Sequence, residues 1–234
     1  MKTILLKFAG PLQSWGTGSH FETRHTDYYP SKSAVIGLIA GSMGIRREEE
    51  ERLEELRNLD FALRIDQQGQ ILRDYHIASK YKPTGVFEKN YVTNRYYLED
   101  AIFMVAIGSE EEEKIEEIAE ALKSPYFQGF MGRRSLPLTA DFFYGIEEKN
   151  PIEALKEIPW QGADWYKKHH KNQLTIYADA HLIPEEKGKP RKDRPISFHQ
   201  KERKFAFRME AKTSCEVPGD LEAKEHDAFG AIGG

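Results

Sequence analysis

Arginines lie beside aromatic residues at several places in the chain, a combination that binds nucleic acids. Arg133 and Arg134 are adjacent in the glycine-containing stretch 128–135, where two guanidinium groups can each bind phosphate oxygens in a bidentate manner. The segments 73–76 (Arg-Asp-Tyr-His) and 95–97 (Arg-Tyr-Tyr) repeat the pairing of a cation with a ring. Unpaired bases stack on such rings while their phosphates pair with the cations. These segments predict a surface that binds single-stranded RNA.

Two segments near the N-terminus carry other groups that contact nucleotides. In the stretch 10–18, three glycines let the backbone approach a ligand closely, and Trp15 offers a ring for stacking. Ser31, Lys32 and Ser33 stand at the start of an expected helix, where hydroxyls, an ammonium and free backbone N–H groups suit a phosphate. The structural alternatives are a turn with a core tryptophan and an ordinary N-cap.

Groups that could cleave RNA are scarcer than groups that could bind it. Cleavage without a metal needs a base, an acid and a cation near the phosphorus, and the run 167–171 (Lys-Lys-His-His-Lys) offers such groups. Tyr75 with His76, and the loop histidines His20 and His25, are further candidates. A solvated basic patch and a hydrogen-bonded strand histidine are the structural alternatives.

Metal and serine chemistry lack their usual patterns in this sequence. His169 and His170 are adjacent, no His-x-x-x-His or Asp-x-Asp spacing accompanies them, and no Gly-x-Ser-x-Gly elbow occurs. We therefore expect no metal site, no catalytic residue and no cofactor. The single cysteine, Cys215, excludes an intrachain disulfide and is expected to be a buried thiol.

The composition is that of an ordinary globular protein, with 39% apolar and 31% charged residues among 234. The net charge is −4, but between Trp160 and Lys212 there are 13 lysines and arginines against 7 acidic residues, a local excess of +6. No stretch approaches the ~18 apolar residues of a membrane helix, and the apolar start is too short for a secretory signal. We expect a cytoplasmic protein that makes no membrane contact.

The candidate residues must be positioned by a fold of the α+β class. Hydrophobic periodicity predicts strands over 3–9, 61–65, 101–108 and 142–146, and helices that begin after Ser31 and cover 47–58 and 110–123. A turn at 67–70 leads into 71–77, and the polar, aromatic stretch 79–98 predicts a hairpin or protrusion rather than core. With that stretch as an insertion, the order of elements is that of a ferredoxin-like (RRM-like) βαββαβ domain.

The chain therefore divides into three expected parts. Residues 1–147 form the ferredoxin-like domain, with the thumb-like insertion at 79–98. Residues 148–217 form a small β-rich C-terminal part, with a short helix at 151–157, strands at 174–182 and 204–212, and a proline- and lysine-rich loop at 184–195. Residues 218–234 form an acidic, flexible tail.

Several motifs resemble, in the same order, those of the CasD subunits of type I-E CRISPR Cascade complexes, which belong to the RAMP superfamily. They lie mostly within the first 140 residues, and the region from Trp160 onward matches only loosely. The matching segments are Leu6–Gly16 (LKFAGPLQSWG), Pro30–Ala40 (PSKSAVIGLIA), Arg73–His76 (RDYH), Arg95–Leu98 (RYYL) and Met131–Leu138 (MGRRSLPL).

The resemblance implies a non-catalytic subunit that binds the 5′ handle of the CRISPR RNA. It also implies that the subunit caps the backbone of CasC subunits, reaches the adjacent CasC with its hairpin thumb, lies near the large subunit CasA, and meets target DNA through the assembled complex. Residue chemistry and motif position then give the expected RNA-binding residues: Gln13, Trp15, Lys32, Ser33, Arg73, Tyr75, His76, Arg95, Arg133, Arg134 and Ser135.

Relatives in type I-C systems resemble the same fold but cut the CRISPR RNA precursor. A metal-independent endoribonuclease that processes this precursor is therefore the alternative function. Its candidate groups would be His76 or the pair His169 and His170.

Overall fold

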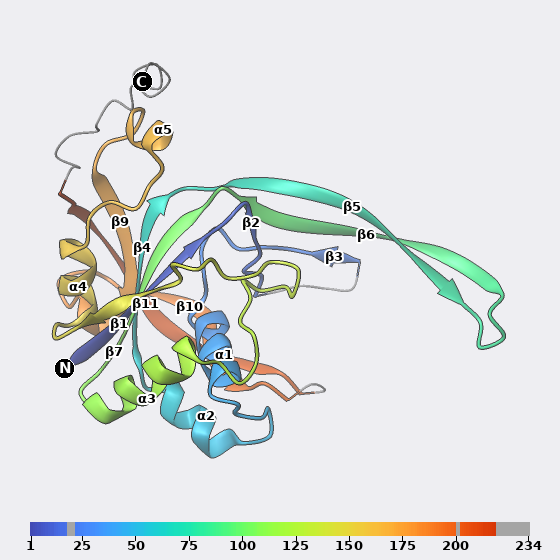
Figure 1. Cartoon of the computed structure of the whole chain (residues 1–234), viewed down its shortest axis with the longest axis horizontal. Coiled ribbons are helices and arrows are strands. Elements are labelled where there is room, and N and C mark those ends of the chain that lie inside the picture. The colour runs from blue at the N-terminus through green and yellow to red at the C-terminus, as the bar shows by residue number, and fades with distance from the viewer. Residues whose placement is uncertain (18–21, 200–201, 219–234) are drawn as a thin grey trace, which may run out of the picture.

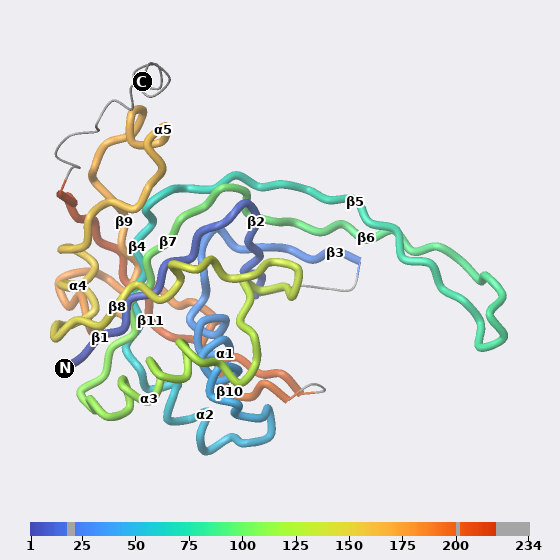
Figure 2. The backbone as a smooth tube through the Cα atoms, viewed as in Figure 1, coloured from blue at the N-terminus to red at the C-terminus, as the bar shows by residue number. Residues whose placement is uncertain are grey.

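The computed structural model describes residues 1–17, 22–199 and 202–218 (Figure 1). A seven-stranded antiparallel sheet forms the body of the molecule, and a four-stranded sheet projects from one side of it as a long hairpin (Figures 1 and 2). The expected acidic tail lies, except for Pro218, outside the described residues.

Part of the large sheet has the strand order of a ferredoxin-like domain. β8 (Phe143–Glu147) pairs with β1 (Lys2–Ala9), β1 with β7 (Ile102–Ser109), and β7 with β4 (Asp60–Gln67), always antiparallel. The four strands of the motif are, in chain order, β1, β4, β7 and β8. Across the sheet they follow the order β8, β1, β7, β4, which is the order fourth, first, third, second of βαββαβ folds. The expected ferredoxin-like domain is confirmed.

Helices cover both faces of this sheet. α1 (Lys32–Ser42), α2 (Glu50–Arg57) and α3 (Glu112–Lys123) pack on one face, where Ile4, Leu6 and Phe8 of β1 point. α4 (Pro151–Glu157) packs on the other face against Leu5 and its neighbours. Because the central strands are covered on both sides, their sequences are nearly continuous apolar runs rather than alternating ones.

The C-terminal strands continue this sheet. β9 (Gln173–Asp179) pairs with β4, β11 (Lys204–Glu216) with β9, and β10 (Lys189–Ser197) with β11. The C-terminal part is β-rich, as expected, but its strands do not form a sheet of their own; they extend the sheet of the ferredoxin-like domain. The expected loop 184–195 is also partly strand, because β10 lies at the sheet edge, where Pro190 and Pro195 need donate no hydrogen bond to an outer neighbour. The expected strand 174–182 ends at Asp179 and is followed by a 3₁₀ turn, η1 (Ala180–Leu182).

The expected thumb is a hairpin longer than the stretch 79–98. β5 (Gln70–Tyr81) and β6 (Phe87–Glu99) pair along their whole length and extend well beyond the body (Figures 1 and 2). At the hairpin base, β6 also pairs with two short strands, β2 (Leu12–Gln13) and β3 (Thr23–Arg24). These contacts fix the hairpin base to the N-terminal loop.

Cys215 is buried, as expected, and burial raises the pKa of its thiol. In the described part of the chain, no helix is long and apolar enough to cross a membrane. Within the same residues, no group of three or more histidine, cysteine or acidic side chains could hold a metal ion.

Candidate nucleic-acid interface

The hairpin has two chemically different faces, because side chains alternate along each strand. Register places Asp74 opposite Arg95 and His76 opposite Thr93, with Lys80 opposite Lys89 further out. We call this side the polar face. The alternate residues of both strands point to the other side, which we call the apolar face because its exposed large side chains include Ile71, Tyr75, Ile77 and Val92. Arg73, Ser79 and Asn90 are exposed on the same side.

The basic loop carrying Arg133 lies against the polar face at the hairpin base. The guanidinium of Arg133 stacks over the ring of Tyr97 at 4.2 Å. Its Nη2 donates to the carbonyl of Tyr96 at 3.1 Å and to that of Arg24 at 3.2 Å. Arg133 therefore joins three segments, the loop, β6 and β3, and its guanidinium is partly used by the protein itself.

Arg24 and Arg95 lie side by side at the same place. β3 pairs in parallel with β6, so that Arg24 stands next to Arg95, while His25 stacks on Tyr96 with ring centroids 5.3 Å apart. Arg134 and Ser135 follow Arg133 and are exposed. We call Arg24, Arg95, Arg133, Arg134 and Ser135 the basic cluster.

The sequence did not point to Arg24, because it lies in a long loop without periodicity. Its parallel pairing with β6 is a long-range contact that no local pattern indicates.

The two glycine-containing loops contact each other. The backbone N–H of Ser14 donates to the carbonyl of Met131 at 3.2 Å. Gly132 has a φ of +84°, and a Cβ there would lie 1.6 Å from the carbonyl oxygen of Ser14. Only glycine allows this approach, so Gly132 sets the position of Arg133 and Arg134.

Gly132→Ala should lower the free energy of unfolding by clearly more than Gly85→Ala. Both glycines have a left-handed backbone, at φ +84° and +79°, but nothing lies within 4 Å of a Cβ at Gly85. The left-handed conformation alone costs a residue with a Cβ about 1–2 kcal/mol. We expect that loss at Gly85 and at least twice that loss at Gly132, measured by urea unfolding. Equal losses would show that the loop moves away from Ser14 without penalty.

Gln13 and Trp15 were expected to contact RNA, but the structure buries both. Trp15 is 2% exposed, its ring packs edge-on against Phe8 at 5.0 Å, and its Nε1 donates to the Gln13 side chain at 2.9 Å. The Gln13 amide in turn donates to the carbonyl of Ala101 at 2.7 Å. These side chains tie the N-terminal loop to the sheet and offer no free ring or amide to a base.

Lys32 and Ser33 are also buried, which corrects their expected role at a phosphate. The Lys32 ammonium donates to Asp179 at 2.8 Å and to the carbonyl of Leu59 at 2.6 Å. Asp193 accepts from the backbone N–H of Lys32 at 3.0 Å, and Ser31 is the N-cap of α1. Carboxylates from the C-terminal strands thus occupy the helix start that was expected to hold a phosphate.

The remaining expected residues divide between the two faces. Arg73 and Tyr75 point to the apolar face, where the Arg73 side chain donates to the Asn94 side chain. His76 and Arg95 point to the polar face, and His76 Nδ1 lies 3.1 Å from the Thr93 hydroxyl. The expected residues therefore do not form one groove, and the basic cluster on the polar side is the part that the structure assembles.

The candidate groups for RNA cleavage lie on separate elements. His76 is in the hairpin, whereas the lysine and histidine run begins at the last residue of α5 (Asp164–Lys167), at another end of the molecule (Figure 1). His20 lies outside the described residues.

A family model described as CRISPR-associated protein (Cas_Cas5) matches residues 3–209. The chain is 32% identical over 178 residues to the CRISPR system Cascade subunit CasD of Escherichia coli (strain K12), which covers 70% of this chain and 80% of that protein. A chain of a solved CRISPR RNA-guided surveillance complex has a TM-score of 0.77 and 30% identity, over 92% of this chain and 91% of that one. A solved structure described as a Cas protein has a TM-score of 0.66 and 30% identity, over 92% and 97%. The resemblance to the CasD subunits is thus confirmed, and the chain belongs to the Cas5 family of CRISPR-associated proteins.

Proposed function

We propose that this protein is the RNA-binding subunit of a type I-E CRISPR surveillance complex of the Cascade kind, and that it holds the 5′ handle of the CRISPR RNA. The observation that carries the proposal is the basic cluster, where three separate segments bring arginines together at the hairpin base. Clustered guanidiniums bind phosphates strongly, and single-stranded RNA presents them on a flexible backbone.

The members of the cluster have different roles in this proposal. Arg134 is exposed and Arg95 half-buried, and together with Arg24 they would bind phosphates of the handle. Arg133 positions the loop through its contacts to Tyr97 and two carbonyls. The ring pair His25 and Tyr96 adjoins Arg24 and Arg95 along the two strands, with Tyr96 on the apolar side of β6, and would stack on a base at the edge of the cluster.

The hairpin is the thumb of this subunit. Its apolar face carries side chains that its own fold leaves exposed, as a protein partner requires. In the proposed complex this face contacts the adjacent CasC subunit, so that the chain caps the CasC backbone. CasA would dock on the body, and target DNA would be met only through the assembled complex.

We further propose that the subunit is not an enzyme. A cleavage site needs base, acid and cation at one phosphate. His76 bonds to Thr93, and the His169–His170 pair lies on a different element from the basic cluster. The CRISPR RNA processing activity of type I-C relatives remains the alternative.

The test compares handle RNA with unrelated RNA of the same length, using the variant Arg95→Ala with Arg134→Ala. We expect binding of the handle to weaken about tenfold or more, and the slope of log affinity against log salt to fall by ~1.4, since each lost phosphate contact on a single strand contributes ~0.7. The matched control is Arg46→Ala with Arg52→Ala, two exposed arginines, the first before α2 and the second within it. Wild-type affinity in the first variant would contradict the proposal.

The same incubation, without metal and resolved on a denaturing gel, tests the enzyme alternative. A binding subunit would leave the repeat RNA intact and would bind it only when the handle is present. Cleavage within the repeat that disappears in His76→Ala or in His169→Ala with His170→Ala would identify a processing nuclease.

A further inference from the structure

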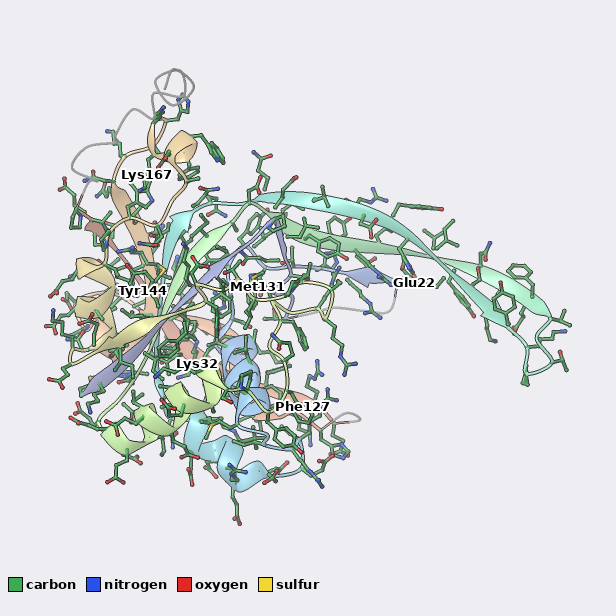
Figure 3. The ribbon with its side chains drawn as sticks, in the orientation of Figure 1. Glu22, Lys32, Phe127, Met131, Tyr144 and Lys167 are labelled. Atoms are coloured by element: carbon green, nitrogen blue, oxygen red, sulfur yellow. The ribbon has the colours of Figure 1, made fainter. Side chains whose placement is uncertain are left out.

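A short turn on the body carries the lysine and histidine run that the basic cluster does not use. It consists of α5 and the residues after it, and we call residues 164–171 the basic turn. Figure 1 shows α5 at the end of the molecule opposite α2, near the start of β5 and away from β3 and the hairpin tip, and Figure 3 labels Lys167 there. The basic turn and the basic cluster are therefore separate surfaces.

The basic turn is held in place by contacts on its inner side. Tyr166 stacks on His170 with ring centroids 3.7 Å apart, and its ring meets Trp160 edge-on at 6.3 Å. The Tyr166 hydroxyl accepts from the backbone N–H of Gln68 at 3.2 Å. His170 Nδ1 lies 2.9 Å from the carbonyl of Tyr166, which closes the turn. A surface built on such a turn is preorganised.

The outer side of the turn presents a ring and cations. Trp165 is 58% exposed, whereas the other two tryptophans of the chain, Trp15 and Trp160, are 2% and 6% exposed. Lys168 and His169 follow Trp165 by three and four residues, the spacing that puts side chains on one side of a helical turn. Lys168 and Lys171 are exposed and form no ion pair with any residue that the structure describes. Asp164 is the only carboxylate in the turn.

From this arrangement we propose that the basic turn is a second binding site, for single-stranded nucleic acid, in which Trp165 stacks on a base while Lys168 and Lys171 pair with neighbouring phosphates. The faces of an exposed indole form no hydrogen bonds with water, so burying one face against a base is favourable. Lysines act as point charges on phosphates and read no sequence, so the site takes any sequence.

The exposed indole indicates that the site binds a single strand rather than a duplex. In a duplex the faces of the bases are already stacked and closed to Trp165, and only the lysines would contribute. The carboxylates of an acidic protein would pair with the lysines, but they offer no ring to the indole, whereas each nucleotide supplies a ring and a phosphate together. The combination of ring and cations therefore favours an unpaired strand, and it does so independently of the proposed handle binding.

The position of the tryptophans provides a direct readout. Because Trp15 and Trp160 are buried, quenching of tryptophan fluorescence by an added strand reports on Trp165. We expect oligothymidylate to quench the fluorescence of the full chain saturably, and Trp165→Phe to remove most of that quench. Lys168→Ala with Lys171→Ala should weaken the apparent affinity about tenfold and lower the salt slope by ~1.4.

Matched variants separate this site from others. Lys187→Ala with Lys189→Ala, exposed lysines on and just before β10, should leave the quench unchanged. Arg95→Ala with Arg134→Ala should also leave it unchanged, so that failure of handle binding and failure of this site are told apart. The proposal is overturned if no saturable quench occurs, if the lysine variant matches wild type, or if a duplex with the same number of phosphates quenches equally well. A circular dichroism spectrum and melting curve confirm that each variant is folded.

Discussion

Asp66→Asn should lower the free energy of unfolding by about 3–5 kcal/mol, because it leaves a buried arginine without its counter-ion. Arg64 is 0% exposed, in the middle of β4. Its Nε and Nη2 donate to the two carboxylate oxygens of Asp66 at 2.8 and 2.7 Å. The remaining donors reach carbonyls at the end of α4 and just beyond it, those of Leu155, Ile158 and Pro159.

The contacts explain why the effect is large. The carbonyls satisfy hydrogen bonds but carry no net charge, so Asp66 alone neutralises the guanidinium inside the sheet–α4 layer. An asparagine keeps the size of the side chain and loses the charge, and a buried cation without a partner is strongly unfavourable. Both residues lie on β4, which pairs with β9. The substitution therefore weakens the sheet where the ferredoxin-like strands join the C-terminal strands.

The control is the same substitution at an exposed ion pair. Asp141 pairs with Lys7 at 2.7 Å, and its side chain is 58% exposed. Lys7 holds the pKa of Asp141 below its usual value, yet exposed pairs contribute only about 0–1 kcal/mol. Denaturant unfolding of both variants measures the difference. Similar losses at the two sites would show that water reaches Arg64 in the folded protein.

Tyr75→Ser with Ile77→Ser should weaken assembly with the backbone subunits about a hundredfold or more while leaving the fold intact. Both side chains project from the apolar face of the hairpin, and Tyr75 is 60% exposed. Since they bury little surface within their own chain, removing them costs little stability. In a complex they would be buried, and truncating a hot-spot residue at the centre of an interface costs about 2 kcal/mol or more.

The chain offers a matched control for this variant. Tyr144 and Ile146 on β8 have the same spacing, are exposed, and lie on the body (Figure 3 labels Tyr144). Tyr144→Ser with Ile146→Ser should assemble like wild type, as measured by co-purification with the CasC subunit and CRISPR RNA. Equal loss in both variants would argue for a general effect of solubility, and no loss in the hairpin variant would remove the proposed thumb contact.

The sequence predicted the elements of the fold better than the roles of single residues. Continuous apolar runs and helical periods predicted β1, β7 and α3 because the core imposes those patterns locally. The joining of β9, β10 and β11 to the same sheet could not be predicted, since strand pairing depends on contacts between distant segments. The two prolines of β10 even indicated a loop.

Site residues were hardest to predict where a distant partner decides their burial. Lys32 has the sequence context of a phosphate ligand, but its ammonium forms an ion pair with Asp179, 147 residues later. Trp15 follows a glycine-containing turn, and only packing against Phe8 distinguishes a core ring from a stacking ring. Adjacent arginines seldom enter a core, and Arg134 is indeed exposed and Arg133 half-buried; that this pair binds RNA stays a prediction.

The buried pairing of α1 with the C-terminal strands has a consequence for the synthesis of the protein. Asp179 and Asp193 follow Lys32 by 147 and 161 residues. At about 5–20 residues per second, the ribosome needs on the order of 10 seconds between them. During that interval the first helix has no counter-charge and β4 has an open edge, so the nascent chain cannot complete its core and is exposed to misfolding. The N-terminal third of the chain therefore reaches its native packing only after the C-terminal third has been synthesised.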